Sequence, residues 1–136
     1  MGILDFLFRR PRNDIARSVR IDGDGTFGFE IVGESFYQDA IAAVAGPKIE
    51  DGYELEVEAA LAPENDNKFD SNAVGVWIQN RKVGHLSKAA AKAYRNDLGT
   101  QHAECDALIV GGWRRTRRDG TIDEGHFGVR LDIADD

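Results

Sequence analysis

Residues 63–86 read Pro-Glu-Asn-Asp-Asn-Lys-Phe-Asp-Ser-Asn-Ala-Val-Gly-Val-Trp-Ile-Gln-Asn-Arg-Lys-Val-Gly-His-Leu, and the rest of the chain is best understood from this stretch. It begins as a polar loop whose Asn and Asp side chains surround a single aromatic residue, Phe69. An apolar strand at 73–78 follows, and a tight turn at Asn80-Arg81 leads to a second short strand that ends at Leu86. Because loops carried by rigid strands commonly hold binding residues, the stretch predicts a functional site on a β-hairpin.

The composition and charge indicate an acidic globular protein with a basic face. The chain has 136 residues, 42% hydrophobic and 30% charged, which predicts one domain with a hydrophobic core. Its net charge of −7 argues against nonspecific binding along nucleic acid. The charge is segregated, however, because no acidic residue occurs at 71–96. That stretch carries the basic residues Arg81, Lys82, Lys88, Lys92 and Arg95, and a second basic group is Arg114, Arg115, Arg117 and Arg118.

Hydrophobic patterning predicts a mainly β domain with some α-helix. The clearest strand is 53–61, where apolar residues alternate with Glu54, Glu56 and Glu58. Other expected elements are strands at 26–33, 73–78, 103–113 and 125–133, a hairpin tip at 115–121 with Asp119-Gly120 as its turn, a short helix at 35–45 and a firm helix at 88–98. Five or six strands with one or two short helices fit an OB-like small β-barrel (α+β), because closure removes exposed sheet edges.

The expected helix after the hairpin carries a basic stripe. Ser87 is well placed as its N-cap and Gly99 as the residue just past its C-terminus. Lys88, Lys92 and Arg95 fall at i, i+4 and i+7, so they share one face. The stripe is either a solvated face or a surface for phosphates, and the sequence leaves both interpretations open.

The N-terminal segment predicts neither a leader nor an anchor. Residues 1–25 are expected to be a flexible tail and linker, which places the folded domain at 26–134. The apolar part of the tail is too short for the core of a signal peptide, and no apolar run approaches the roughly 18 residues of a membrane span. We therefore expect a monomeric cytoplasmic protein that contacts no membrane. Cys105 lies in an apolar run and is expected to be a small buried hydrophobe.

The loop lacks the patterns of common catalytic and metal sites. Asp66 and Asp70 lie four positions apart, without the alternating acids and central Gly of an EF-hand. The three His residues have no metal-ligand spacing, and the chain contains no Walker-type phosphate loop. We therefore expect a protein that is not an enzyme and uses no cofactor or metal. A metal-dependent nuclease centred on Asp66 and Asp70 is a competing hypothesis.

The loop suits a single-stranded nucleic-acid end better. An aromatic face such as Phe69 stacks on a base, and nearby cations neutralise phosphates. The Asp70 carboxylate repels phosphate, so it favours a free hydroxyl and would select a strand terminus. The competing structural interpretation is an Asx-turn network that only holds the strand entry.

Two motifs resemble the HIRAN domain family. Residues 63–76, Pro-Glu-Asn-Asp-Asn-Lys-Phe-Asp-Ser-Asn-Ala-Val-Gly-Val, are similar to its pattern Glu-Pro-x-Asn-x-(Tyr/Phe)-Asp-x-Asn-Ala-(Val/Ile)-x-Val, and residues 82–86, Lys-Val-Gly-His-Leu, resemble the strand that follows. Residues 32–38, Val-Gly-Glu-Ser-Phe-Tyr-Gln, resemble the other family motif, Val-x-Gly-x-x-(Tyr/Phe)-Tyr. The resemblance covers about residues 26–134.

The resemblance implies an OB-like barrel that captures the 3′-hydroxyl end of single-stranded DNA, as family members fused to DNA-remodelling proteins do in fork reversal. Asp70 would accept a hydrogen bond from the 3′-OH, and Phe69 would stack on the terminal nucleotide. Phe36 and Tyr37 would line the same pocket. With Lys92 of the basic stripe added, the expected DNA-binding residues are Phe36, Tyr37, Asn67, Phe69, Asp70, His85, Lys88 and Lys92.

The chain departs from the family pattern in ways that lower the expected affinity. Phe at positions 36 and 69 keeps a stacking surface but lacks a phenolic hydroxyl, and Ser35 lies where DNA-binding members can carry a basic residue. The alternative function is a protein-interaction module that docks a DNA-processing or defence partner, with Phe6-Leu7-Phe8 of the tail as its anchor.

Overall fold

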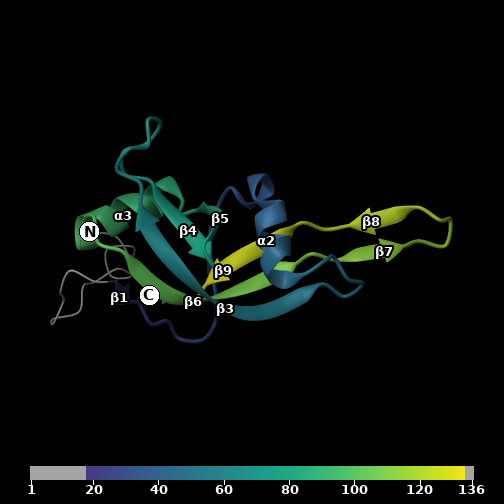
Figure 1. Ribbon diagram of the computed structural model, residues 1–136. Coiled ribbons are helices and arrows are strands. Elements are labelled where there is room, and N and C mark those ends of the chain that lie inside the picture. The colour runs from purple at the N-terminus through teal and green to yellow at the C-terminus, as the bar shows by residue number, and fades with distance from the viewer. Residues whose placement is uncertain (1–17, 134–136) are drawn as a thin grey trace.

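The computed structural model describes residues 18–133, which form nine strands, one short 3-10 helix and two α-helices (Figure 1). In chain order the elements are β1 (Val19–Arg20), β2 (Phe29–Glu30), η1 (Glu34–Phe36), α2 (Gln38–Ala45), β3 (Tyr53–Pro63), β4 (Val74–Ile78), β5 (Arg81–His85), α3 (Lys88–Leu98), β6 (Ala103–Gly111), β7 (Arg114–Thr116), β8 (Ile122–Glu124) and β9 (Phe127–Leu131). No helix in this part of the chain has the length and apolar character needed to cross a membrane.

The main sheet curls into an OB-like half-barrel. Its strands lie in the order β2-β9-β6-β3-β4-β5 with antiparallel neighbours, and β1 adds a parallel pairing on β6. Just after β2, Val32 exchanges two 2.9 Å backbone hydrogen bonds with His85 at the end of β5. The two ends of the strand order therefore meet, and the predicted mainly β, OB-like fold with short helices is confirmed.

The structure has more strands than the five or six predicted. The additional strands are short: β1 has two residues, and β7 and β8 have three each. Elements of this length are too short for a period-two pattern to be visible in the sequence. The β7–β8 hairpin projects beyond the barrel (Figure 1), and its turn lies at Asp119-Gly120 as predicted, with Gly120 at φ 85°.

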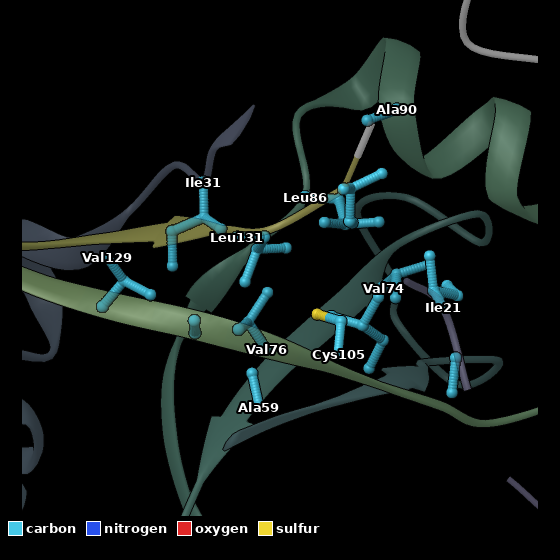
Figure 2. Packing of buried hydrophobic residues seen from close by; sticks show 14 of the residues in the cluster. Ile21, Ile31, Ala59, Val74, Val76, Leu86, Ala90, Cys105, Val129 and Leu131 are labelled. Atoms are coloured by element: carbon cyan, nitrogen blue, oxygen red, sulfur yellow. The ribbon is translucent and has the colours of Figure 1, made fainter. Parts of the chain in front are cut away.

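The core lies inside the curl of the sheet. Figure 2 shows Ala59 of β3, Val76 of β4, Cys105 of β6 and Leu131 of β9 converging, with Ala90 of α3 above them in this view. All five side chains are buried, so the prediction for Cys105 is confirmed, and burial raises the pKa of its thiol to about 12. A buried thiol with a raised pKa is a packing residue and a poor nucleophile.

Strand β3 is buried on one face only in its second half. Leu61 is buried, whereas Leu55 on the same face is 37% exposed. The alternation along β3 predicted one continuous inner face. The strand runs for 11 residues and pairs with β6 along most of that length. Ala59 and Leu61 near its end are fully buried in the core, whereas Tyr53 and Val57 nearer its start are only partly buried against it. Periodicity reports which residues share a face, and the packing partners decide how much of that face is covered.

The predicted domain boundary at residue 25 is wrong for the described part of the tail. Val19 and Ile21 are buried in the core, and their amides donate to His102 O at 3.0 Å and Glu104 O at 2.9 Å. The run Val-Arg-Ile alternates correctly for a strand but is too short to be recognised beside a Gly-rich segment. The rest of the predicted tail, residues 1–17, lies outside the described residues.

One turn and one strand also differ in detail from the sequence predictions. The β4–β5 turn is centred on Gln79-Asn80, one position earlier than predicted, and both residues have positive φ (50° and 63°) as a tight hairpin requires. The expected strand at 26–33 pairs in a ladder only at Phe29–Glu30. The Asp132 carboxylate accepts hydrogen bonds from the backbone amides of Gly25 and Phe27. These bonds hold the residues before β2 as a loop.

The helices lie close to the ranges predicted from the sequence. The helix predicted at 35–45 is divided into η1 and α2 by Tyr37, whose φ of −129° is not helical. In α3, the Ser87 hydroxyl accepts a 3.2 Å hydrogen bond from Ala90 N and Gly99 closes the helix, as predicted. The face of α3 that carries Ala90, Ala91, Tyr94 and Leu98 is buried, with Tyr94 fully enclosed.

Candidate nucleic-acid interface

The loop between β3 and β4 is built around the side-chain amide of Asn67. Asn67 Oδ1 accepts hydrogen bonds from Phe69 N at 2.8 Å and Asp70 N at 3.0 Å, while Nδ2 donates to Glu64 Oε1 at 3.0 Å. Asp70 Oδ1 in turn accepts from Asn72 N at 2.9 Å. The loop is therefore an Asx-turn network, as the structural interpretation expected. Asn67 uses both ends of its amide within the loop, which makes it a scaffold residue before any ligand arrives.

This network holds Phe69 away from the protein. The Phe69 side chain is 97% exposed although its backbone amide is fixed by Asn67. A single exposed apolar side chain is common on protein surfaces, so Phe69 is informative because of the groups that accompany it. Asp70 lies beside it, half-buried, and its Oδ2 accepts no hydrogen bond from residues 18–133. The loop thus presents one flat aromatic face next to one carboxylate oxygen.

Glu64 fastens the loop to strand β5, and it was missed in the sequence. It pairs with Lys82 through Oε2 and lies 3.0 Å from His85 Nε2 through Oε1, in addition to its bond with Asn67. Burial alone would raise the pKa of Glu64, but the hydrogen bonds from Lys82, Asn67 and His85 outweigh it and lower the pKa to about 2. Glu64 is therefore the ionised centre of the site.

A signal for Glu64 existed in the sequence. It continues the outward-facing series of β3 begun by the exposed Glu54 and Glu58, and it comes directly before the polar loop. The facing strand has a glycine at this level: Gly75 is the register partner of Ala62, and a Cβ there would lie 2.7 Å from Glu64 Oε2. A glycine inside an apolar strand commonly marks such a close approach.

Arg95 fastens the other side of the loop to helix α3. Its guanidinium donates to Asn65 Oδ1 at 2.6 Å and to the carbonyl oxygens of Asn72 and Ala73, each at 3.2 Å. The predicted basic stripe therefore divides into two parts. Arg95 is committed to the loop, whereas Lys88 and Lys92 remain exposed on the helix.

The aromatic residues of the second motif approach the same network from η1. The Tyr37 and His85 rings lie 6.3 Å apart between centroids and are tilted by 56°. The structure thus links Tyr37, His85, Glu64 and Asn67 in one continuous chain of contacts. Phe36 precedes Tyr37 and is 85% exposed. Each of the two exposed phenylalanines is thus close in sequence to an end of this chain, Phe36 beside Tyr37 and Phe69 two residues after Asn67.

The predicted site residues are brought together unequally. Tyr37, Asn67 and His85 join through Glu64, and Asp70 and Phe69 join through Asn67. Lys88 and Lys92 contribute to the site only by lying on α3, the helix that Arg95 binds to the loop. Within residues 18–133, no three His, Cys, Asp or Glu side chains are grouped as a metal site, and the exposed Asp66 belongs to no such group.

No family model, curated protein or solved structure matches this chain. The chemistry of the site is therefore the basis for its function. It combines exposed aromatic faces, an ionised carboxylate network, a second carboxylate beside Phe69 and two exposed lysines. On such a surface a base can stack on an aromatic ring, a hydroxyl can donate a hydrogen bond to a carboxylate, and the lysines can neutralise phosphates.

Proposed function

We propose that this protein is a HIRAN-like module that binds the 3′-hydroxyl end of single-stranded DNA and catalyses no reaction. The observation that carries the proposal is Phe69, whose backbone amide is held by Asn67 and whose side chain is 97% exposed beside the carboxylate of Asp70. Stacking of a base on an exposed aromatic ring contributes about 1–3 kcal/mol. The terminal base covers Phe69, and Phe36 offers a second stacking face across the network.

Asp70 supplies the selectivity for a free end. Its Oδ2 is available to accept a hydrogen bond from a 3′-hydroxyl, whereas a 3′-phosphate or a continuing phosphodiester brings negative charge against it. The motif Phe-Asp-x-Asn-Ala, by which the chain resembles HIRAN domains, falls on this part of the loop. In this proposal Asn67 and Asn72 hold the loop shape, and Phe69 and Asp70 contact the nucleotide.

The cations of the site predict modest affinity that depends strongly on salt. Lys82 is paired with Glu64, and Arg95 is bonded to the loop, so neither is free for a phosphate. Of the lysines predicted to bind DNA, Lys88 and Lys92 are exposed, and they are assigned to the phosphates that precede the terminal nucleotide. Two neutralised phosphates correspond to a slope of about −1.4 in log K against log salt for a single strand. A cytoplasmic, monomeric role in repair or processing of DNA ends fits this weak, end-specific binding.

The test is fluorescence anisotropy with one labelled oligonucleotide that ends in either a 3′-hydroxyl or a 3′-phosphate. The wild-type protein is expected to prefer the hydroxyl, and Asp70→Asn is expected to lose that preference because it removes the repulsive charge. The matched control is Asp66→Asn, an exposed acid of the same loop, which should keep the preference. Equal affinity for the two ends, or no binding, contradicts the proposal.

The same two exposed phenylalanines favour a second candidate function. Exposed aromatic side chains are typical anchors of protein interfaces. If neither oligonucleotide binds, Phe36 and Phe69 are assigned to a protein partner instead, as the protein-interaction alternative expects.

A further inference from the structure

A groove lies on the outer face of β3 and β4, and of the residues described for the candidate DNA site it shares Glu64. Its volume is about 540 Å³, and its lining includes Glu58, Ala60, Ala62, Trp77, Asn80 and His102. The groove is hollow because the small side chains of Ala60 and Ala62 leave space beside the indole ring of Trp77, which faces Ala60 across the two strands. The result is an apolar floor with one large aromatic wall.

The rim of the groove is acidic. Glu58 and Glu64 lie in its lining, and the neighbouring surface carries Glu56 and Asp106. A hydrogen bond with Glu58 raises the pKa of Glu104, which shows how closely the carboxylates crowd here. Arg20 pairs with Asp22, Glu58 and Asp106, and these acids outnumber it. Such a rim repels phosphate, so it disfavours nucleic acid and favours a ligand with positive charge.

Strand β1, close to where the described part of the chain begins, lies beside this groove. Val19 N donates a 3.0 Å hydrogen bond to His102 O, and His102 lines the groove. The preceding sequence begins Met-Gly-Ile-Leu-Asp-Phe-Leu-Phe-Arg-Arg-Pro-Arg, an apolar run followed by arginines. Phe8 lies 11 positions before Val19. That length of chain spans up to about 36 Å, whereas neighbouring strands lie only about 5 Å apart.

We propose that this groove is the intramolecular binding site of the chain's own N-terminal segment. The apolar side chains of Leu4, Phe6, Leu7 and Phe8 cover Ala60, Ala62 and Trp77, and the arginines at positions 9, 10 and 12 face the acidic rim. The charge of the segment complements that of the groove, and the short tether raises its local concentration. This inference does not rest on DNA binding, because none of the residues proposed to contact the nucleotide or its phosphates, Phe69, Asp70, Lys88 and Lys92, lines the groove.

The test uses the 136-residue chain with a nitroxide attached at Asp5→Cys. The buried Cys105 leaves the introduced thiol as the reactive one. In a ¹⁵N spectrum, the nitroxide is expected to broaden the Trp77 indole and Asn80 side-chain signals, with recovery after reduction of the label. The amide of Thr121, on the projecting hairpin, should remain sharp. Sharp Trp77 and Asn80 signals overturn the proposal.

A matched variant separates docking from mere tethering. The labelled chain with Phe6→Ser, Leu7→Ser and Phe8→Ser keeps the same length and charge, and it is expected to lose the broadening. Broadening that persists unchanged in this variant overturns the proposal, because the tether alone then explains it. A second sample mixes ¹⁵N-labelled chains that carry no nitroxide with nitroxide-bearing chains that carry no ¹⁵N. Broadening of the Trp77 and Asn80 signals in this mixture assigns the groove to a second copy of the chain, and this outcome overturns the intramolecular assignment.

Discussion

Glu64 and His85 lie 21 positions apart in the chain, yet Glu64 Oε1 is 3.0 Å from His85 Nε2. This contact joins the loop after β3 to the last residue of β5. The backbone of His85 in turn pairs with Val32, which leads into η1. The carboxylate of Glu64 thus connects the two sequence motifs, one carrying Tyr37 and the other carrying Asn67.

Glu64→Gln is expected to lower stability in a pH-dependent way. The folded-state pKa of Glu64 is about 2 against an ordinary value of 4.5, so its contribution is fully present above pH 4.5 and is lost as the pH falls towards 2. Because the carboxylate is partly solvated, we expect the variant to lose roughly 2 kcal/mol at pH 7. Chemical unfolding from pH 7 to pH 2 measures this, and the two curves should converge near pH 2. Parallel curves would show that Glu64 is not the stabilising ion.

Phe69→Ser is expected to weaken binding of the oligonucleotide about 5- to 150-fold, the equivalent of one lost stack. Its unfolding temperature should hardly change, because a residue that is 97% exposed contributes little to folding. Anisotropy and thermal unfolding on the same samples check both statements. Ile122→Ser, on the projecting hairpin and also exposed, is the matched control and should change neither quantity.

Arg95→Ala is expected to release the loop from α3. The loss of bonds to Asn65, Asn72 and Ala73 should cost about 1 kcal/mol of stability and also lower DNA affinity, since Phe69 is then less rigidly held. Arg95→Lys should fail to rescue either, because an ammonium group cannot reproduce the three-way contact of the guanidinium. Full rescue by lysine would mean that only the charge matters.

Lys92→Ala is expected to change the salt dependence of binding while stability stays the same. Each phosphate contact contributes about −0.7 to the slope of log K against log salt for a single strand. Removing one exposed lysine should therefore reduce the slope from about −1.4 to about −0.7. Titrations at several salt concentrations measure the slope. The same slope in wild type and variant would remove Lys92 from the interface.

Cys105 is expected to be unreactive towards thiol reagents in the folded protein. Burial encloses the side chain and raises the pKa of its thiol to about 12, so little thiolate forms at neutral pH. Reaction with a disulfide reagent should appear only as denaturant unfolds the chain. Thr100→Cys places a thiol at an exposed position and should react immediately, which confirms the activity of the reagent.

The sequence by itself determined the elements whose signals are local. Ser87 and Gly99 marked the two ends of helix α3, because capping depends on neighbouring backbone groups. The alternation in β3 indicated which face turns inward, and Leu61 lies on that face in the core. The Asx-turn character of the loop around Asn67 was also readable, since its hydrogen bonds span only two or three residues.

Only the tertiary structure decided which distant residues meet. β1 was hidden because two residues show no period, and its place beside β6 depends on burial of Val19. The charge of a side chain does not indicate its partner: Arg95 and Lys92 share a helix, but one is bonded to the loop and the other is exposed. Likewise Glu64 continues the series of solvated glutamates in β3, and it becomes the centre of the site only because the curled sheet brings Lys82 and His85 against it.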